Sequence, residues 1–145
     1  MRLVGYYHER MMPVQLYLMV ALGGALGTIT RFVISGLAAA SFGETFPWGT
    51  MIINVAGSFV IGFFATLTAP DGRLFVSGTT RQFVMTGFCG GFTTFSSFSL
   101  QTLNLLSDGE FVQAGGNVVG SVTLCLFSVW LGSIAAATLN QLKGA

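Results

Sequence analysis

Long apolar stretches separated by short charged turns dominate this chain. Four such stretches are present, and only the first contains a charged residue, Arg31: residues 11–43, 45–70, 82–107 and 111–142. About 20 predominantly apolar residues are enough to cross the hydrocarbon core of a bilayer. The pattern therefore predicts an all-α membrane protein with four transmembrane helices per subunit, near residues 14–40, 48–68, 82–106 and 111–140.

Turn-forming residues mark the ends of the predicted helices. The segments "SFGETFPWG", "APDGR" and "SDGE" combine Gly, Pro, Asp and Ser between apolar runs, which is typical of loops. They predict a single transmembrane domain over residues 13–145, after an N-terminal extension of residues 1–12. The extension is not interpreted as a signal peptide, because the apolar run behind it is too long.

The Lys and Arg residues predict the orientation of the chain in the membrane. Cytoplasmic loops carry an excess of these residues. With four helices, one side holds Arg2, Arg10, Arg73, Arg81 and Lys143, and the other holds Arg31. This places the N-terminus in the cytoplasm, although a start at Met11 would reduce the count to three against one.

Composition narrows the class further. Of the 145 residues 52% are hydrophobic and 8% are charged, whereas soluble domains are about 25% charged. The net charge is +1 and no Lys/Arg cluster is present, which excludes nucleic acid as a partner. Cys89 and Cys125 lie in apolar runs without metal-ligand spacing, so we expect free thiols.

The third stretch contains the segment "GFCGGFTTFSSFS", which is unusually rich in glycine and hydroxyl side chains for a membrane helix. Two interpretations fit. A break in the helix would release main-chain oxygens such as those of Gly90 and Thr93, which suit hard cations. Alternatively, the segment is a flexible helix whose Ser and Thr side chains bond back to their own carbonyls.

Three phenylalanines, Phe92, Phe95 and Phe98, recur at intervals of three in the same segment. A stripe of this kind normally faces lipid. However, aromatic rings are electropositive at their edges, so ring edges can also line the path of an anion.

Polar and small residues in the other helices have two interpretations each. Gly23, Gly27 and Arg31 share one helical face, which predicts close helix packing, with Arg31 at the far interface or beside an aqueous vestibule. Asn54 in the second helix either hydrogen-bonds a neighbouring helix to aid packing or is a neutral hydrogen-bond donor for a permeating ion.

The fourth helix contains the segment "GNVVG", which predicts a packing face. Ser121, which follows this segment, either bonds to its own helix or faces a lumen.

Titratable groups are absent from the interior of the predicted helices. No Asp, Glu, His or Lys lies well inside any of them. A proton-coupled transporter or an intramembrane hydrolase needs such a group in its site. The sequence therefore predicts passive transport and no enzymatic activity.

Three motifs resemble the Fluc or CrcB family of small bacterial fluoride channels. They are "GGALGTITR", "WGTMIINVAGSF" and "GFCGGFTTFSSFSLQT", and the resemblance extends from about residue 14 to residue 140. It implies passive efflux of fluoride across the bacterial inner (cytoplasmic) membrane, which reduces fluoride toxicity. It also implies a dual-topology, antiparallel homodimer with two pores, in which the third helix is broken mid-membrane.

The resemblance assigns roles to individual residues. Those of the fluoride pore are Asn54, Phe95, Phe98, Ser96, Ser97, Thr50 and Ser121. Arg31 matches a vestibule arginine, and the main-chain carbonyls of Gly90 and Thr93 match those that hold a structural Na⁺ on the dimer axis. The chain departs from the family pattern at Gln101, Asn117 and Cys125, where Glu, Tyr and Ser are found in other members.

Two other functions stay open. A small multidrug exporter also has four helices, but its first helix carries an acidic residue, and this chain has Arg31 there. A non-transporting membrane subunit would use the glycine faces to bind its partners. Transport by the purified protein in liposomes would distinguish it from a channel.

Overall fold

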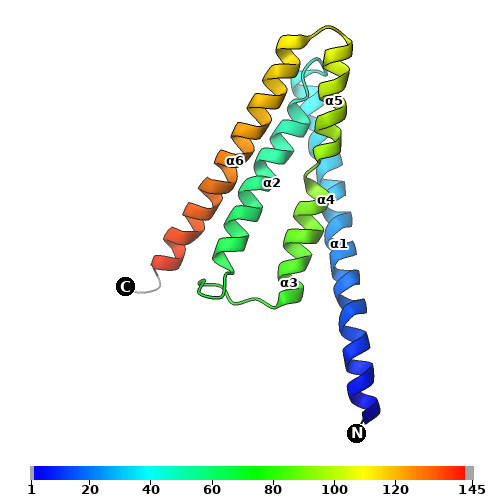
Figure 1. Cartoon of the computed structure of the whole chain (residues 1–145), viewed down its shortest axis with the longest axis vertical. Helices are drawn as coiled ribbons and strands as arrows, with labels where there is room; N and C mark the ends of the chain where they lie inside the picture. Colours follow the sequence, from blue (N-terminus) through cyan, green and yellow to red (C-terminus); the bar gives the residue numbers. More distant parts are fainter. Residues whose placement is uncertain (1, 143–145) are drawn as a thin grey trace.

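The computed structural model describes the backbone of residues 2–142 and the side chains of residues 14–142. Within that range the chain is helical and contains no strand (Figure 1). Its elements are α1 (Arg2–Phe42), α2 (Trp48–Leu67), α3 (Gly78–Gln82), the π-helix η1 (Phe83–Cys89), α4 (Gly90–Phe92), α5 (Phe95–Ser107) and α6 (Phe111–Gln141). The side chains of Arg2 and Arg10, and Lys143 as a whole, used above to predict orientation, lie outside the described part.

Three helices are long and apolar enough to cross a membrane: Val14–Phe42 within α1, α2 and α6. Their ends agree with the predicted helices to within two residues, because charged and turn-forming residues mark them. Residues 2–12, predicted as an extension, continue α1 as helix. The multi-pass, all-helical prediction is therefore confirmed.

The third apolar stretch is built from several short helical pieces between Gly78 and Ser107. The backbone of Thr93 (ψ 158°) and Thr94 (φ −153°) is extended between α4 and α5. The Thr94 hydroxyl accepts the Ser97 N–H at 3.2 Å and so caps the N-terminus of α5. The π-helix η1, whose main-chain hydrogen bonds join residues i and i+5, is not predicted by the sequence pattern.

Glycines bring the helices into close contact. A Cβ at Gly23 or Gly27 would overlap main-chain atoms of η1, so the glycine face of α1 packs against the third stretch as predicted. On the other side of the molecule, Gly62 of α2 and Gly132 of α6 approach each other's helix equally closely. The face predicted for "GNVVG" is confirmed in part within one chain: a Cβ at Gly120 would lie 3.3 Å from the Met51 side chain of α2, whereas one at Gly116 would meet no other helix within 4 Å.

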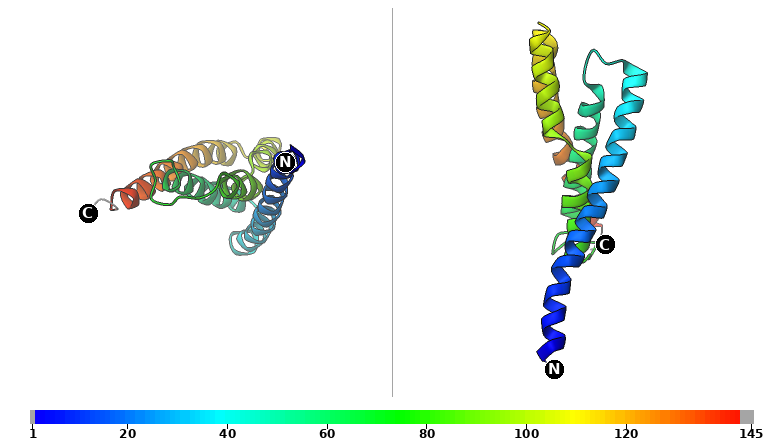
Figure 2. Two further views of the ribbon diagram at one scale, coloured as in Figure 1. Left: turned by 90° about the horizontal axis from the view of Figure 1, so that it is seen from below. Right: turned by 90° about the vertical axis from the view of Figure 1, so that its right-hand side faces the viewer.

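The elements stand roughly side by side, with α2 between α6 and the α3–α5 stretch, and α1 on the opposite flank from α6 (Figures 1 and 2). The α1–α2 and α5–α6 loops lie together at one end, where Gly43 and Gly109 have positive φ. At the other end Arg81 donates to the carbonyls of Ala65 and Thr68, which lie at the C-terminal end of α2. Cations are favourable at such helix ends.

Replacing Gly27 by Ala tests the close contact of α1 with the third stretch. The added methyl group would overlap Phe88 O, so we expect a loss of about 1–3 kcal/mol in the free energy of unfolding. Gly36→Ala is the matched control, because Gly36 lies on the same helix with open space around it. Reversible unfolding in mixed micelles measures both. Equal stability of the two variants would show that this contact is absent.

Candidate ion path at the helix interruption

The side chain of Asn54 pairs with the interrupted backbone of the third stretch. Its Oδ1 accepts the Thr94 N–H at 2.8 Å, and its Nδ2 donates to Thr94 O at 3.1 Å. A primary amide is the right shape to replace a peptide group in this way, since it offers a donor and an acceptor in one plane. Asn54 of α2 therefore holds the extended segment in place across two helices, which is the packing role considered above.

The interruption leaves two main-chain oxygens without their usual helical donors. In a continuous helix the Thr94 N–H would bond to Gly90 O and the Ser97 N–H to Thr93 O. Here the first goes to Asn54 Oδ1 and the second to Thr94 Oγ1. Backbone carbonyl oxygens are good ligands for hard cations. The carbonyl oxygens of Gly90 and Thr93 thus suit a cation such as Na⁺ as ligands.

A groove of about 410 Å³ lies beside the interruption, between α2, the third stretch and α6. We call it the central groove. Its lining includes four residues of the predicted fluoride pore and both residues of the predicted cation site: Asn54, Phe95, Phe98 and Ser121, with Gly90 and Thr93. None of the described residues that line it is charged. Neutral donors and carbonyl dipoles are therefore the polar groups that an ion would meet there.

The three phenylalanines have different surroundings, so they do not form one lipid-facing stripe. Phe92 is buried and stacks on Phe88. Phe98 is also buried, whereas Phe95 is 75% exposed in the single chain. The rings of Phe95 and Phe98 lie 5.2 Å apart between centroids and are tilted by 46°. The two rings are therefore neighbours without being stacked face to face.

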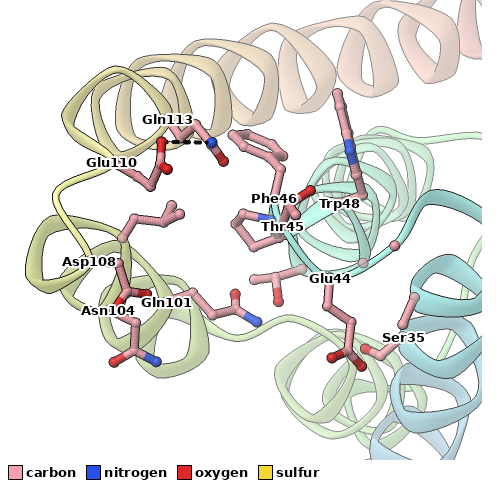
Figure 3. Close-up of a pocket in the computed structure, with 16 residues that line it drawn as sticks. Ser35, Glu44, Thr45, Phe46, Trp48, Gln101, Asn104, Asp108, Glu110 and Gln113 are labelled. Atoms are coloured by element: carbon pink, nitrogen blue, oxygen red, sulfur yellow. Dashed lines mark hydrogen bonds between the residues drawn. The ribbon is translucent and has the colours of Figure 1, made fainter.

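A second cavity, of about 600 Å³, opens at the end of the molecule that carries the α1–α2 and α5–α6 loops (Figure 3). We call it the end cavity. Thr50 lines it, one helical turn before Asn54, so α2 connects the two cavities. Glu44, Asp108 and Glu110 also line it, and Gln113 donates to Glu110 at 3.0 Å. The Oε1 of Gln101, in the same lining, is buried without a hydrogen-bond partner in the described chain.

Three of the predicted residues lie outside both linings in the single chain: Arg31, Ser96 and Ser97. Ser96 is exposed and lies 3.2 Å from Thr94 Oγ1, and Ser97 contacts the same oxygen. Arg31 is half-buried on α1 and forms no ion pair or hydrogen bond with the described side chains. The Ser residues thus belong to the cap of α5.

Several residues of the site were not singled out for it by the sequence. Thr94 holds both the Asn54 pair and the α5 cap, yet its hydroxyl was one of five in the segment. Asn117 and Thr102 bond to each other at 2.9 Å across α5 and α6. Gly57 leaves room for the Thr93 side chain against α2. Thr is a preferred N-cap residue, and this preference was a clue to Thr94 at the start of α5.

Comparison with known proteins identifies the family of the chain. Residues 18–133 match the family described as CrcB-like protein, Camphor Resistance (CrcB). The chain belongs to the CrcB-like family. Membership confirms the resemblance on which the residue roles were based.

Relatives that carry the name fluoride-specific ion channel FluC are similar over most of the chain. The protein of Opitutus terrae is 70% identical over 129 residues, which are 89% of this chain and 98% of that one. The protein of Methylocella silvestris is 57% identical over the same shares of the two chains. That of Rhodospirillum rubrum is 58% identical over 86% of this chain and 97% of its own. These relatives are named as channels, not as enzymes.

The structure places all three residues at which the chain departs from the CrcB family pattern. Asn117 is buried and bridges α5 and α6, and Gln101 lies in the end cavity. Cys125 lines the central groove, and both Cys89 and Cys125 are free thiols, as predicted.

Replacing Thr94 by Val tests the cap that starts α5. Valine has the same shape but cannot accept the Ser97 N–H, so we expect the free energy of unfolding to fall by about 1 kcal/mol. Thr123→Val is the control, because Thr123 lies on the exposed surface of α6. Thermal unfolding in detergent compares the two. A Thr94→Val protein as stable as the control would mean that the hydroxyl does not cap the helix.

Proposed function

We propose that this chain is a fluoride-selective channel that lets fluoride leave the cytoplasm passively and so reduces its toxicity. One observation carries the proposal. The central groove joins an amide, a hydroxyl and two aromatic rings at a helix interruption, without a charged side chain in its lining. Relatives of up to 70% identity bear the name of a fluoride channel.

The chemistry of the groove suits a small, strongly hydrated anion. Asn54 Nδ2 has two N–H groups and gives one of them to Thr94 O, which leaves the second for an ion. The edges of Phe95 and Phe98 add weak positive potential. Several modest sites in series allow an ion both to enter and to leave. The neutral lining also disfavours a multidrug exporter, which needs an acidic group.

Two antiparallel copies in the inner (cytoplasmic) membrane of a bacterium would form the complete channel. Phe95 is 75% exposed in a single chain although it lines the groove, so the path is open on one side. A second copy packed there would close it and form two equivalent paths. In this arrangement the interruption at Thr93 and Thr94 lies mid-membrane, Thr50 precedes Asn54 along the path, and Arg31 is beside a vestibule.

A structural Na⁺ on the dimer axis would be held by the main-chain oxygens of Gly90 and Thr93. Opposed carbonyl dipoles from two chains, brought together without a cation, would be costly in a medium of low dielectric constant. Both oxygens lack the N–H donors of a continuous helix, which supports this role. The ion would supply the positive charge that joins the two interruptions.

Efflux from proteoliposomes loaded with fluoride or chloride tests the function. We expect a fluoride electrode to record rapid release of fluoride, while chloride stays inside. A non-transporting subunit would release neither ion. Proton-driven uptake of a hydrophobic cation, without fluoride release, would identify a multidrug exporter instead.

Replacing Asn54 by Asp tests the central donor. A fixed negative charge about 4 Å from fluoride costs about 4 kcal/mol, which corresponds to a roughly thousandfold lower efflux. We therefore expect no measurable efflux from a protein that still elutes as a dimer. Asn104→Asp adds the same charge at an exposed position of the end cavity and should retain most of the efflux. Undiminished efflux through Asn54→Asp would refute the role of Asn54.

Removal of sodium tests the cation site. After prolonged exchange of the purified protein into N-methylglucamine buffer, we expect fluoride efflux to stop and to return when Na⁺ is added back. The physical reason is that the oxygens of Gly90 and Thr93 lose their counter-charge. Full efflux after exhaustive exchange would exclude a required cation at these oxygens.

A further inference from the structure

A chain of hydrogen bonds runs from α5 through α6 to the central groove. Thr102 Oγ1 donates to Phe98 O at 2.8 Å, and Asn117 Nδ2 donates to Thr102 Oγ1 at 2.9 Å. Ser121 Oγ then donates to Asn117 Oδ1 at 3.2 Å. Asn117, in the middle, is 1% exposed. Ser121 is also buried, Thr102 is half-buried, and Ser121 lines the groove.

Each hydrogen bond in this series is donated away from the groove, from Ser121 to Asn117, then to Thr102 and then to Phe98 O. A serine hydroxyl has one proton, and that of Ser121 goes to Asn117. Only lone pairs of Ser121 Oγ then remain for the groove, and lone pairs repel an anion. Ser121 cannot donate a hydrogen bond to fluoride unless Asn117 presents its Nδ2 donor to Ser121 Oγ in place of its Oδ1 acceptor.

Rotation of the Asn117 amide by half a turn exchanges its oxygen and its nitrogen, since the two ends have the same shape. The Thr102 hydroxyl would then donate to Asn117 Oδ1, and Asn117 Nδ2 would donate to Ser121 Oγ. The proton of Ser121 becomes free to point into the groove. Phe98 O keeps its main-chain donor within α5, so no buried polar group loses its last partner.

We propose that Thr102, Asn117 and Ser121 form a reversible hydrogen-bond relay. In it, Asn117 is the positioning residue that allows Ser121 to donate a hydrogen bond to fluoride. This inference rests on the proposed function. With fluoride as the final acceptor, both directions contain three hydrogen bonds, so reversal leaves the number of bonds unchanged. Neither Asp nor Leu at residue 117 can form the hydrogen bonds of both directions. A carboxylate has no N–H donor, and a leucine side chain has neither a donor nor an acceptor.

Fluoride efflux through Asn117→Leu, Ser121→Ala and the double variant tests the relay. Without Asn117, the Ser121 hydroxyl bonds back to its own helix, so we expect each single variant to lose about tenfold in efflux, the effect of one hydrogen bond to a charged group. The double variant should match the single ones. Ser128→Ala is the matched control, because buried Ser128 of α6 bonds to Val55 O and lies outside the groove lining.

Normal efflux through Asn117→Leu, or an Asn117→Leu effect that is undiminished when Ser121 is already Ala, would overturn the relay. If the wild-type protein released no fluoride at all, the proposed function itself would fail. A fluoride-conducting wild type with insensitive variants would exclude the relay alone.

A second measurement uses the unaltered protein and does not depend on how the variants fold. In protein labelled with ¹⁵N-asparagine, the side-chain NH₂ signal of Asn117 should shift when fluoride is added and stay in place with chloride. A purely structural Asn117 would show the same signal with both salts, which would contradict the relay.

Discussion

The side-chain amide of Asn54 completes the main-chain hydrogen bonding where the third stretch is not helical. Unpaired backbone groups are costly in a membrane, so irregular backbone needs partners from the protein. Asn54 provides both partners that Thr94 needs, at 2.8 and 3.1 Å. The carbonyls of Gly90 and Thr93, the start of α5 and the position of Phe95 all follow from an interruption at this point. One polar side chain on α2 thus stabilises the interruption around which the site is built.

Close helix packing places this pair where it can act. Gly23 and Gly27 bring α1 against η1, while Gly62 and Gly132 bring α2 against α6. With both flanks fixed, Ser121 of α6 and Asn54 of α2 line the same groove. Thr50 lines the end cavity one helical turn before Asn54, so polar positions follow one another along α2. The proposed ion path is therefore a consequence of glycine-mediated packing as much as of its polar residues.

Local signals in the sequence were enough for the helix ends and for much of the site. Charges and turns mark α2 and α6, and the spacing of Gly23 and Gly27 predicted a packing face. Other features depend on contacts distant in sequence. Asn117 was recognised only as a departure from a family pattern, because its partner Thr102 is 15 residues away on another helix. The π-helix η1 could not be predicted, because a seven-residue apolar segment has no periodicity that distinguishes it from an α-helix.

The exchange rate of the Thr94 backbone amide tests the central claim most directly. Measured by NMR in deuterated buffer, it should be strongly protected in the wild type and exchange freely in Asn54→Leu, which has no acceptor at that position. Amides within α2 should remain protected in both proteins. Equal protection of the Thr94 amide in the two proteins would mean that the helix continues through this residue. Asn54 would then not be the acceptor of the Thr94 N–H.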